Sequence, residues 1–436
     1  MATLNMRGME TTPAVPAPPA AADYSRPLVI VTTLFFMWGF LTCLNDILVP
    51  HLKSIFGLSY ARVMLVQFAF FSAYFLFSVP WSRIVNHLGY QRTMVAGLLT
   101  MALGAFLFLP AAAALSYPLF LTALVVLATG ITGLQVAANP YVVALGKPET
   151  ASSRLDLTQA FNSLGTTVAP KLGGLLILSA APLAVEKLRQ LSPQAMEAYR
   201  VQQAASVKLP YLVIGALLTL LALLINASRL PKIETAASRS ERAGDSVRRH
   251  PNLVFGAIGI FAYVGAEVSI GSFLVNYFGL RDIAGMSAVT AAGYVSFYWG
   301  GAMIGRFLGA AVLRRVKAGY VLAACAVCAS ALVTASMMTG GVTAMWTILA
   351  VGFFNSIMFP TIFSLGVAEL GPLTGNGSGL LNMAIVGGAV LPLIQGVIAD
   401  RFGLHHAFVL PVICYLYIIF YALSGSKPNS ARYARA

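Results

Sequence analysis

The chain has 436 residues, of which 58% are hydrophobic and only 10% are charged. A soluble domain carries a surface on which about a quarter of all residues are charged, so this composition excludes an ordinary water-soluble fold. A lipid bilayer removes that requirement because it allows the outside of a protein to be apolar. The formal net charge of +14 would suggest nucleic acid as a partner of a soluble protein, but the basic residues here follow a different pattern.

Residues 1–27 include a stretch rich in Ala, Pro and Thr without periodicity, which predicts a disordered cytoplasmic tail. Apolar runs of about 20 residues follow along the whole chain and predict an all-α membrane protein with twelve transmembrane helices. The first run is too long for a signal-peptide core and is expected to remain. The expected spans are 28–50, 61–84, 91–112, 116–145, 157–181, 208–229, 251–279, 288–313, 318–338, 342–368, 376–399 and 404–424.

The basic residues alternate between the two sides of these spans. Of the 28 Lys and Arg residues, eighteen fall in the two tails and in the loops after even-numbered spans, and eight fall in the loops after odd-numbered spans. Positive residues mark the cytoplasmic side, so both termini are expected in the cytoplasm, in a bacterial inner membrane. This distribution explains the charge without nucleic acid.

A basic stretch at 230–250 separates six spans from six and predicts a cytoplasmic linker. The predicted organisation is two pseudo-symmetric six-helix bundles, 28–229 and 251–425, followed by a cytoplasmic tail at 426–436. An internal repeat supports it: Pro140 and Pro360 are 220 residues apart, as are Asn162 and Asn382. Two related halves around a central site are the arrangement that alternating access uses.

Three ionisable residues lie inside the expected spans in the outer half of the membrane: Asp46, Lys171 and Glu267. Such residues are costly in a bilayer and commonly mark ion or substrate pathways. A buried carboxylate can exchange a proton, and Lys171 is a cation that can alternate between acidic partners. Sodium coordinated by carboxylates and backbone carbonyls stays open as the coupling ion. A static ion pair that holds helices together stays open for Lys171.

Neutral hydrogen-bonding side chains surround these charges. Amides both donate and accept, so they can bind sugar hydroxyls without requiring a charged ligand, while aromatic rings can cover the apolar face of a sugar. The alternative for each amide is a hydrogen bond between helices. The candidate substrate-binding residues are Asn45, Gln135, Asn139, Gln159, Asn162, Tyr263 and Asn382.

Proline and glycine indicate local features of the spans. Pro140, Pro170, Pro360 and Pro392 lie inside spans, where proline removes a backbone hydrogen bond and favours either a kink or a discontinuous helix near a site. Gly301, Gly305 and Gly309 recur every four residues, a spacing that lets helix backbones approach closely.

Several motifs resemble the fucose permease family of the major facilitator superfamily, in order from span one to span eleven. They are Asn45-Asp46-Ile47-Leu48-x-Pro50, Gln135-x-x-x-Asn139-Pro140, Gln159-Ala160-Phe161-Asn162-Ser163-x-Gly165, Tyr263-x-Gly265-Ala266-Glu267, Gly305-Arg306-Phe307 and Phe359-Pro360-Thr361-Ile362-Phe363-Ser364-Leu365-Gly366. The resemblance implies a twelve-helix fold and proton-driven import of a monosaccharide. Asp46 matches the coupling acid of the family on span one.

The chain departs from fucose permease at three positions. Gln135 stands where fucose permease has a second functional acid, Glu267 stands where it has glutamine, and Lys171 replaces an apolar residue. The runs around Glu267 and Lys171 look more like the glucose/galactose transporter branch, which favours glucose, galactose or a related hexose as substrate. We hypothesise that the second carboxylate has moved from span four to span seven, with Asp46 carrying the coupling proton.

Two other classes of function remain as rivals. An exporter of drugs or metabolites would have the same fold but a larger and more apolar cavity with fewer amides. The other class is a membrane enzyme or a sensor. An enzyme would need a nucleophile with a base or a set of metal ligands, and the five histidines lie in expected loops or at span ends. A sensor would carry a soluble signalling domain, for which the linker at 230–250 is too short. The expected protein is therefore not an enzyme, needs no cofactor or metal, and works as a monomer.

Overall fold

The computed structural model describes residues 24–56, 60–177, 192–233 and 250–428, and every regular element in these ranges is helical. The longer helices are α1 Ser25–Phe56, α2 Tyr60–Ala113, α3 Tyr117–Ala144, α4 Ala151–Ile177, α6 Pro193–Ala227, α7 Pro251–Gly279, α8 Ala288–Val312, α9 Ala318–Met338, α10 Gly341–Asn355, α11 Met358–Gly366, α12 Thr374–Met383, α13 Gly387–Phe402 and α15 Val409–Phe420. Short helices are η1 Pro148–Thr150, η4 Gly371–Leu373, η5 Ala384–Val386, α14 Leu404–Ala407 and η6 Tyr421–Gly425.

All twelve predicted spans coincide with helix, although span five is described only to Ile177. Eight described helical segments are long and apolar enough to cross a membrane. One of them, Phe70–Ala113, contains a sharp change of direction at Gly89, where φ is 78°. Only glycine adopts that backbone region at little cost, so Gly89 divides α2 into the predicted second and third spans. Helix α6 begins at Pro193, well before the predicted span at 208.

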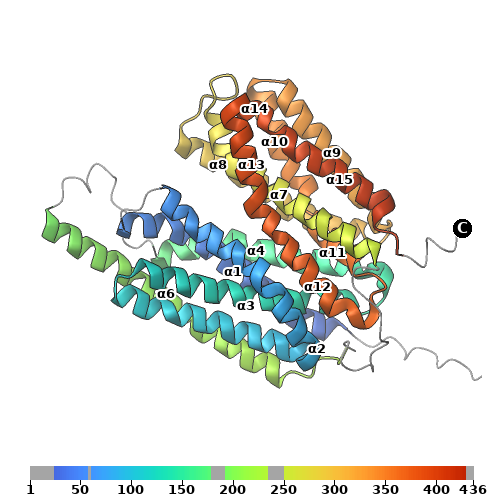
Figure 1. Ribbon diagram of the computed structural model, residues 1–436, viewed down its shortest axis with the longest axis horizontal. Coiled ribbons are helices and arrows are strands. Elements are labelled where there is room, and N and C mark those ends of the chain that lie inside the picture. Colours follow the sequence, from blue (N-terminus) through green and yellow to red (C-terminus); the bar gives the residue numbers. More distant parts are fainter. Residues whose placement is uncertain (1–23, 57–59, 178–191, 234–249, 429–436) are drawn as a thin grey trace, which may run out of the picture.

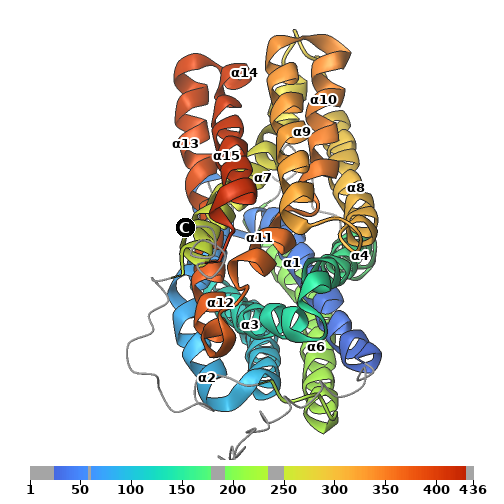
Figure 2. The ribbon, with the colours of Figure 1, turned by 90° about the vertical axis from the view of Figure 1, so that its right-hand side faces the viewer.

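The helices gather into two groups. Figure 1 shows α1, α2, α3, α4 and α6 on one side and most of α7–α15 on the other, and Figure 2 shows the same division from the side. Within the first group α2 packs on α3 and α6, and α1 packs on α4; within the second, α10 packs on α8 and α9, and α7 packs on α13 and α15. Between the groups, α4 packs against α8 and α11, and α12 packs against α2 and α3.

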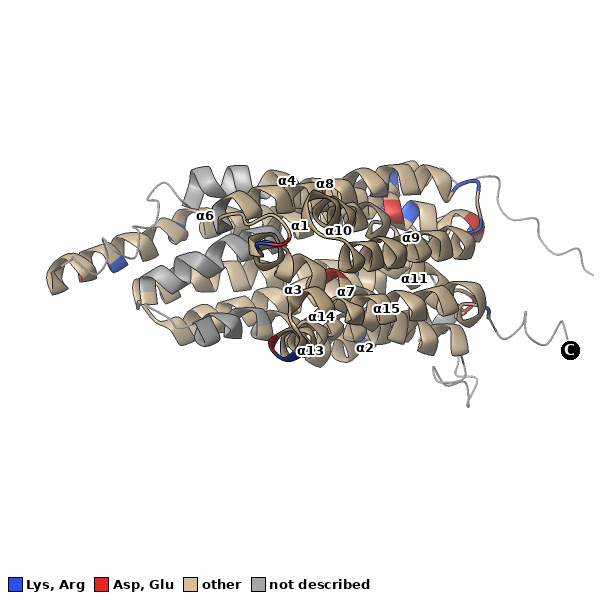
Figure 3. Ribbon diagram, turned by 90° about the horizontal axis from the view of Figure 1, so that it is seen from above, with Lys and Arg blue, Asp and Glu red and all other residues tan. Residues whose placement is uncertain are grey.

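Charged residues are absent from most of the described helix length, as Figure 3 shows for the view from above. Large apolar side chains such as Phe68, Leu220 and Leu393 are instead more than half exposed on the outside. An apolar exterior of this kind suits contact with lipid tails rather than water. The fold therefore has the surface that the composition predicts.

The proline-containing spans differ between the two groups. Helix α3 continues through Pro140 without a break. The predicted tenth span is divided between α10 and α11 just before Pro360, and the eleventh is divided between α12 and α13 by the short helix η5, upstream of Pro392. The predicted discontinuity therefore occurs in spans ten and eleven, next to Asn355 and Asn382.

Candidate functional site

The two groups of helices are joined by hydrogen bonds at one end of the molecule, which we call the closed end: the starts of α4 and α12 and the ends of α8 and α11. The hydroxyls of Ser152 and Ser364 lie 2.6 Å apart, and Ser153 donates to the backbone oxygen of Ala310 at 2.6 Å. Ser378 on α12 donates to the backbone oxygen of Val136 on α3 at 2.9 Å. These bonds fix α4 on α8 and α11, and α12 on α3.

Arg306 on α8 is a charge that bridges the two groups of helices near this interface. Its Nη1 donates to the hydroxyl of Ser163 and, at 3.4 Å, to the backbone oxygen of Gln159, both on α4. Its Nε donates to the backbone oxygen of Ser356, between α10 and α11, at 3.2 Å. The positive charge of Arg306 also acts on two carboxylates, Glu267 and Asp156. One cation therefore links the closed end with the acidic residue predicted on α7.

Glu267 is half-buried on α7, and its carboxylate oxygen Oε1 accepts a hydrogen bond of 2.7 Å from the hydroxyl of Tyr263, one turn earlier. A spacing of four residues places both side chains on the same helix face. A separate chain of hydrogen-bonded side chains lies close enough to Glu267 for the charge of this carboxylate to act on Tyr298 and Tyr415. In that chain Asn355 donates to Tyr298 and accepts from Tyr415, both at 2.8 Å.

The predicted amides of the first group are deeply buried. Gln135 on α3 donates to the hydroxyl of Tyr74 at 2.7 Å, and its side-chain oxygen has no hydrogen-bond partner. Asn139, one turn further along α3, is fully buried with neither side-chain atom bonded. The side-chain nitrogen of Gln159 on α4 is likewise unpartnered. Buried amides need partners, and the described residues supply none to these atoms in this arrangement.

Two other predicted residues already have hydrogen bonds within the fold. Asn162 donates through Nδ2 to the backbone oxygen of Phe35 at 2.9 Å, where α1 approaches α4 closely at Gly39. Asn382 donates to the backbone oxygen of Ser378 at 2.9 Å and keeps an unpartnered side-chain oxygen. Asn162 therefore holds α1 on α4 in this arrangement, while Asn382 keeps acceptor capacity.

Three predicted residues cannot be placed relative to these side chains. Asn45 and Asp46 belong to the helix α1 and Lys171 belongs to α4, but their side chains lie outside the described residues. The structure thus brings together Glu267, Tyr263 and Arg306, and separately Gln135 and Tyr74.

Asp156 and Gln395 are among the buried polar residues that sequence reasoning missed. Asp156 on α4 is fully buried against Gly309 of α8, and both of its carboxylate oxygens lack a hydrogen-bond partner. The expected span begins at 157, so Asp156 was assigned to the loop before it. Gln395 on α13 is fully buried with an unpartnered amide. Its position inside an apolar span was the signal that could have identified it.

The helix arrangement and this polar interior define a membrane transporter, and comparisons with known proteins agree. The family model of the Major Facilitator Superfamily matches residues 29–391, and the chain belongs to that family. Its relatives are transporters rather than enzymes. The expected fold class and the expected absence of an enzymatic function are therefore confirmed by family membership.

The relatives identify the branch of the family more closely. A glucose/galactose transporter of Brucella abortus is 52% identical and covers 93% of this chain and 95% of its own length. A putative glucose/galactose transporter of Helicobacter pylori is 45% identical over 91% of this chain and 96% of its own length. An L-fucose–proton symporter of Escherichia coli is 35% identical over 93% of this chain and 94% of its own length. The resemblance seen in the motifs is thus confirmed along nearly the whole chain.

Solved structures match the fold. A crystal structure of a variant of the Escherichia coli fucose:proton symporter superposes with a TM-score of 0.87 at 34% identity and covers 93% of this chain and 100% of that chain. A crystal structure of the transporter FucP in the outward conformation gives a TM-score of 0.85 with the same identity and coverage. The all-α membrane fold predicted from the sequence is therefore the fold of these transporters.

Proposed function

We propose that this protein imports a hexose, glucose or galactose, together with a proton by alternating access. The observation that carries the proposal is a set of buried amides with free hydrogen-bonding atoms in a chain that is 52% identical to a glucose/galactose transporter. Sugar hydroxyls both donate and accept, so they can satisfy such amides without an ion pair. The amides with unpartnered atoms are Gln135, Asn139, Gln159 and Asn382.

In this proposal the substrate also contacts Asn45, Asn162 and Tyr263. For Asn162 the contact requires its bond to Phe35 to open or to be shared, because Nδ2 already donates to that backbone oxygen. Tyr263 is the residue through which substrate and coupling site communicate, since its hydroxyl bonds directly to Glu267. A sugar hydroxyl that replaces this bond would change the state of the carboxylate.

We assign ion coupling to Asp46, Glu267 and Lys171, with Asp46 carrying the proton. Glu267 supports the assignment by its position inside α7, its hydrogen bond from Tyr263, and the charge of Arg306 acting on it. A charge in the membrane interior is costly unless it is compensated. The relative named L-fucose–proton symporter supports a proton rather than sodium as the coupling ion.

We further propose that the closed end faces the cytoplasm, with both termini on that side of a bacterial inner membrane. The bundles 28–229 and 251–425 then separate at the cytoplasmic end during each cycle, and the protein works as a monomer. The starts of α4 and α12 lie at the closed end, as expected for odd-numbered spans that begin on the cytoplasmic side. The likeness to FucP in the outward conformation supports this assignment.

The proposal is tested by uptake of radiolabelled glucose, galactose and fucose into proteoliposomes under a pH gradient, a sodium gradient, or neither. We expect glucose or galactose to accumulate only when the outside is more acidic. One pH unit supplies about 1.4 kcal/mol per proton, which permits about tenfold accumulation at a stoichiometry of one.

Accumulation driven only by sodium would contradict proton coupling while leaving hexose as the substrate. Accumulation of fucose alone would contradict the substrate assignment. Absence of uptake for all three sugars, in protein shown to be folded, would make export of a different compound the leading function.

A further inference from the structure

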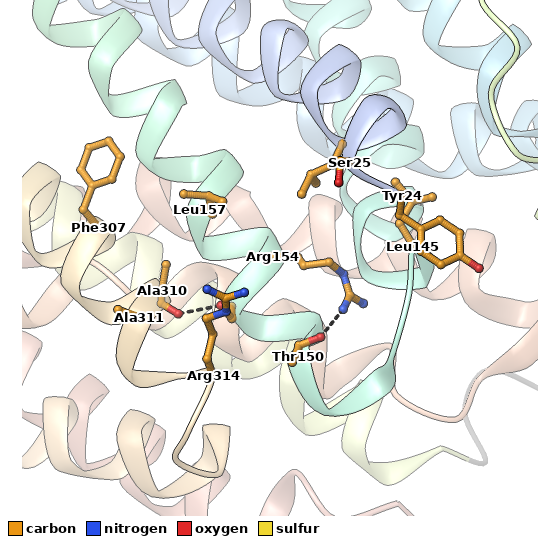
Figure 4. Close-up of a pocket in the computed structure, with 12 residues that line it drawn as sticks. Tyr24, Ser25, Leu145, Thr150, Arg154, Leu157, Phe307, Ala310, Ala311 and Arg314 are labelled. Carbon is orange, nitrogen blue, oxygen red and sulfur yellow. Dashed lines mark hydrogen bonds between the residues drawn. The ribbon is translucent and has the colours of Figure 1, made fainter. Parts of the chain in front are cut away.

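A pocket of about 700 Å³ lies between the two groups of helices near the closed end (Figure 4). The first group supplies residues from the start of α1, the α3–α4 connection and the start of α4; the second supplies the end of α8. Its walls are formed by Tyr24, Ser25, Leu28, Leu145, Thr150, Ser153, Arg154, Leu157, Phe307, Ala310, Ala311 and Arg314. This pocket is separate from the amides and from Glu267.

The pocket combines an apolar wall with two guanidinium groups, and none of its described lining residues is a carboxylate. Arg154 is largely used by the fold: it donates to the backbone oxygens of Val143 and Lys147 at 2.8 Å and to the hydroxyl of Thr150. Arg314 differs, because its exposed guanidinium has no hydrogen-bond or ion-pair partner within the described part of the chain. Among its described lining residues, the pocket therefore offers Arg314 as a free cation beside an apolar surface.

The position of the pocket matches the headgroup level of a bilayer. Tyr24 immediately precedes α1 and Arg314 lies two residues after the end of α8, so the pocket opens where membrane-spanning helices end. Tyrosine and arginine are both favoured at that depth. Leu28 and Leu157 follow the first residues of α1 and α4, and Phe307 precedes the end of α8, so all three lie on the side toward the membrane interior.

We propose that this pocket binds one anionic phospholipid. Arg314 bonds the phosphate, while Leu28, Leu157 and Phe307 contact the upper acyl chain. Basic pockets between transmembrane helices on the cytoplasmic side bind acidic headgroups in this way. The proposal rests on the membrane-transporter fold and on the orientation given above, but it does not depend on which sugar is transported.

Lipid binding at this pocket favours the conformation in which the two groups of helices are joined at the closed end. The lipid contacts α1 and α4 in one group and α8 in the other, so the full site exists only while α4 and α8 are adjacent. A ligand shifts a conformational equilibrium toward the state that it binds better. Anionic lipid therefore raises the population in which the groups are joined at this end.

The test is native mass spectrometry of the full-length protein titrated with phosphatidylglycerol or phosphatidylcholine. The variant Arg314→Gln is compared with Arg315→Gln, a matched control one residue further on that removes the same charge from an exposed position outside the pocket. We expect Arg314→Gln to bind phosphatidylglycerol about tenfold more weakly, as loss of one charge-assisted bond predicts. Arg315→Gln and phosphatidylcholine binding should change little.

A second variant keeps the test valid if Arg314→Gln is poorly folded. Leu157→Trp fills the apolar part of the pocket and should also reduce the bound phosphatidylglycerol. Glycerol phosphate is titrated in parallel, because equal retention of this soluble headgroup would show a phosphate site rather than a lipid site. Equal losses in Arg314→Gln and Arg315→Gln would overturn the proposal in favour of diffuse attraction. If phosphatidylglycerol bound only after removal of residues 1–23, that segment and not lipid would occupy the pocket in the full-length protein, and the proposal would be overturned.

Discussion

Glu267 holds a carboxylate inside the apolar helix α7, where it accepts a 2.7 Å hydrogen bond from Tyr263 and lies near the charge of Arg306. A carboxylate so placed is stabilised by a hydrogen bond worth about 1.5–3 kcal/mol for a charged group. Its protonation is therefore sensitive to anything that displaces the tyrosine hydroxyl.

At the residue scale, we predict that Glu267→Gln loses proton-driven accumulation while sugar exchange between equal concentrations continues. Glutamine keeps the size and a hydrogen-bond acceptor but carries no charge, so Glu267 no longer acts on the proton that Asp46 carries, and a pH gradient no longer drives uptake. Sugar accumulation driven by a gradient of one pH unit should fall by about tenfold, because that is the accumulation that one coupled proton permits. Uptake and exchange in proteoliposomes measure both quantities.

The control is Asp400→Asn, which neutralises an exposed carboxylate at the end of α13. It should leave accumulation and exchange unchanged. Full proton-driven accumulation in Glu267→Gln would remove Glu267 from the coupling site and leave Asp46 as the candidate acid.

At the scale of single elements, α8 shows how small residues position the site. A Cβ at Gly305 would lie 2.5 Å from the backbone oxygen of Phe353 on α10, and a Cβ at Gly309 would collide with Ile357. At Gly301 the nearest atom would be 3.4 Å away, an ordinary contact. The predicted close approach is therefore confirmed at Gly305 and Gly309, which lie on either side of Arg306 along α8.

We predict that Gly305→Ala destabilises the protein by about 1–3 kcal/mol, because overpacking against a backbone oxygen forces α8 away from α10. Gly300→Ala on the same helix is the matched variant, since its Cβ would meet no atom within 4 Å. It should be neutral or gain up to about 1 kcal/mol from helix propensity. Thermal unfolding in detergent compares the two; equal midpoints would contradict the packing argument.

At the scale of the whole molecule, the closed end is held by hydrogen bonds between small polar side chains and backbone oxygens. Each neutral bond contributes only about 0.5–1.5 kcal/mol net, so the set holds the two groups together without making separation prohibitive. That balance suits an interface that has to open and close in every transport cycle. Asp156 lies fully buried in the same interface with both oxygens unpartnered, which costs free energy in the closed arrangement.

We predict that a disulfide between Ser152→Cys and Ser364→Cys stops transport. The two hydroxyls, one on α4 and one on α11, are 2.6 Å apart. The cysteines can therefore form a disulfide only while α4 and α11 are in contact. Oxidation should reduce sugar uptake to background, and reduction should restore it. The two single variants under the same oxidant are the controls, and undiminished uptake by the cross-linked protein would show that this end does not open.

The class of protein, the helical fold and most of the candidate residues could be predicted from local residue patterns. Composition excluded a soluble fold, apolar run length located the spans, and the motifs from Asn45 to Gly366 indicated the family, because each of these depends only on local residue pattern. The buried amides Gln135, Asn139 and Gln159 were found because polar side chains stand out in apolar runs. The roles predicted for Asp46 and Lys171 stay predictions.

The contacts between candidate residues depend on how distant helices pack. Arg306 reaches from α8 to Ser163 on α4, a partner 143 residues away in the chain, and no local pattern encodes that contact. Asp156 was missed for the same reason, because its burial depends on α8 covering the start of α4 rather than on its neighbours in sequence. Helix packing between segments distant in sequence fixes these partners, whereas hydropathy acts within one segment and fixes only the spans.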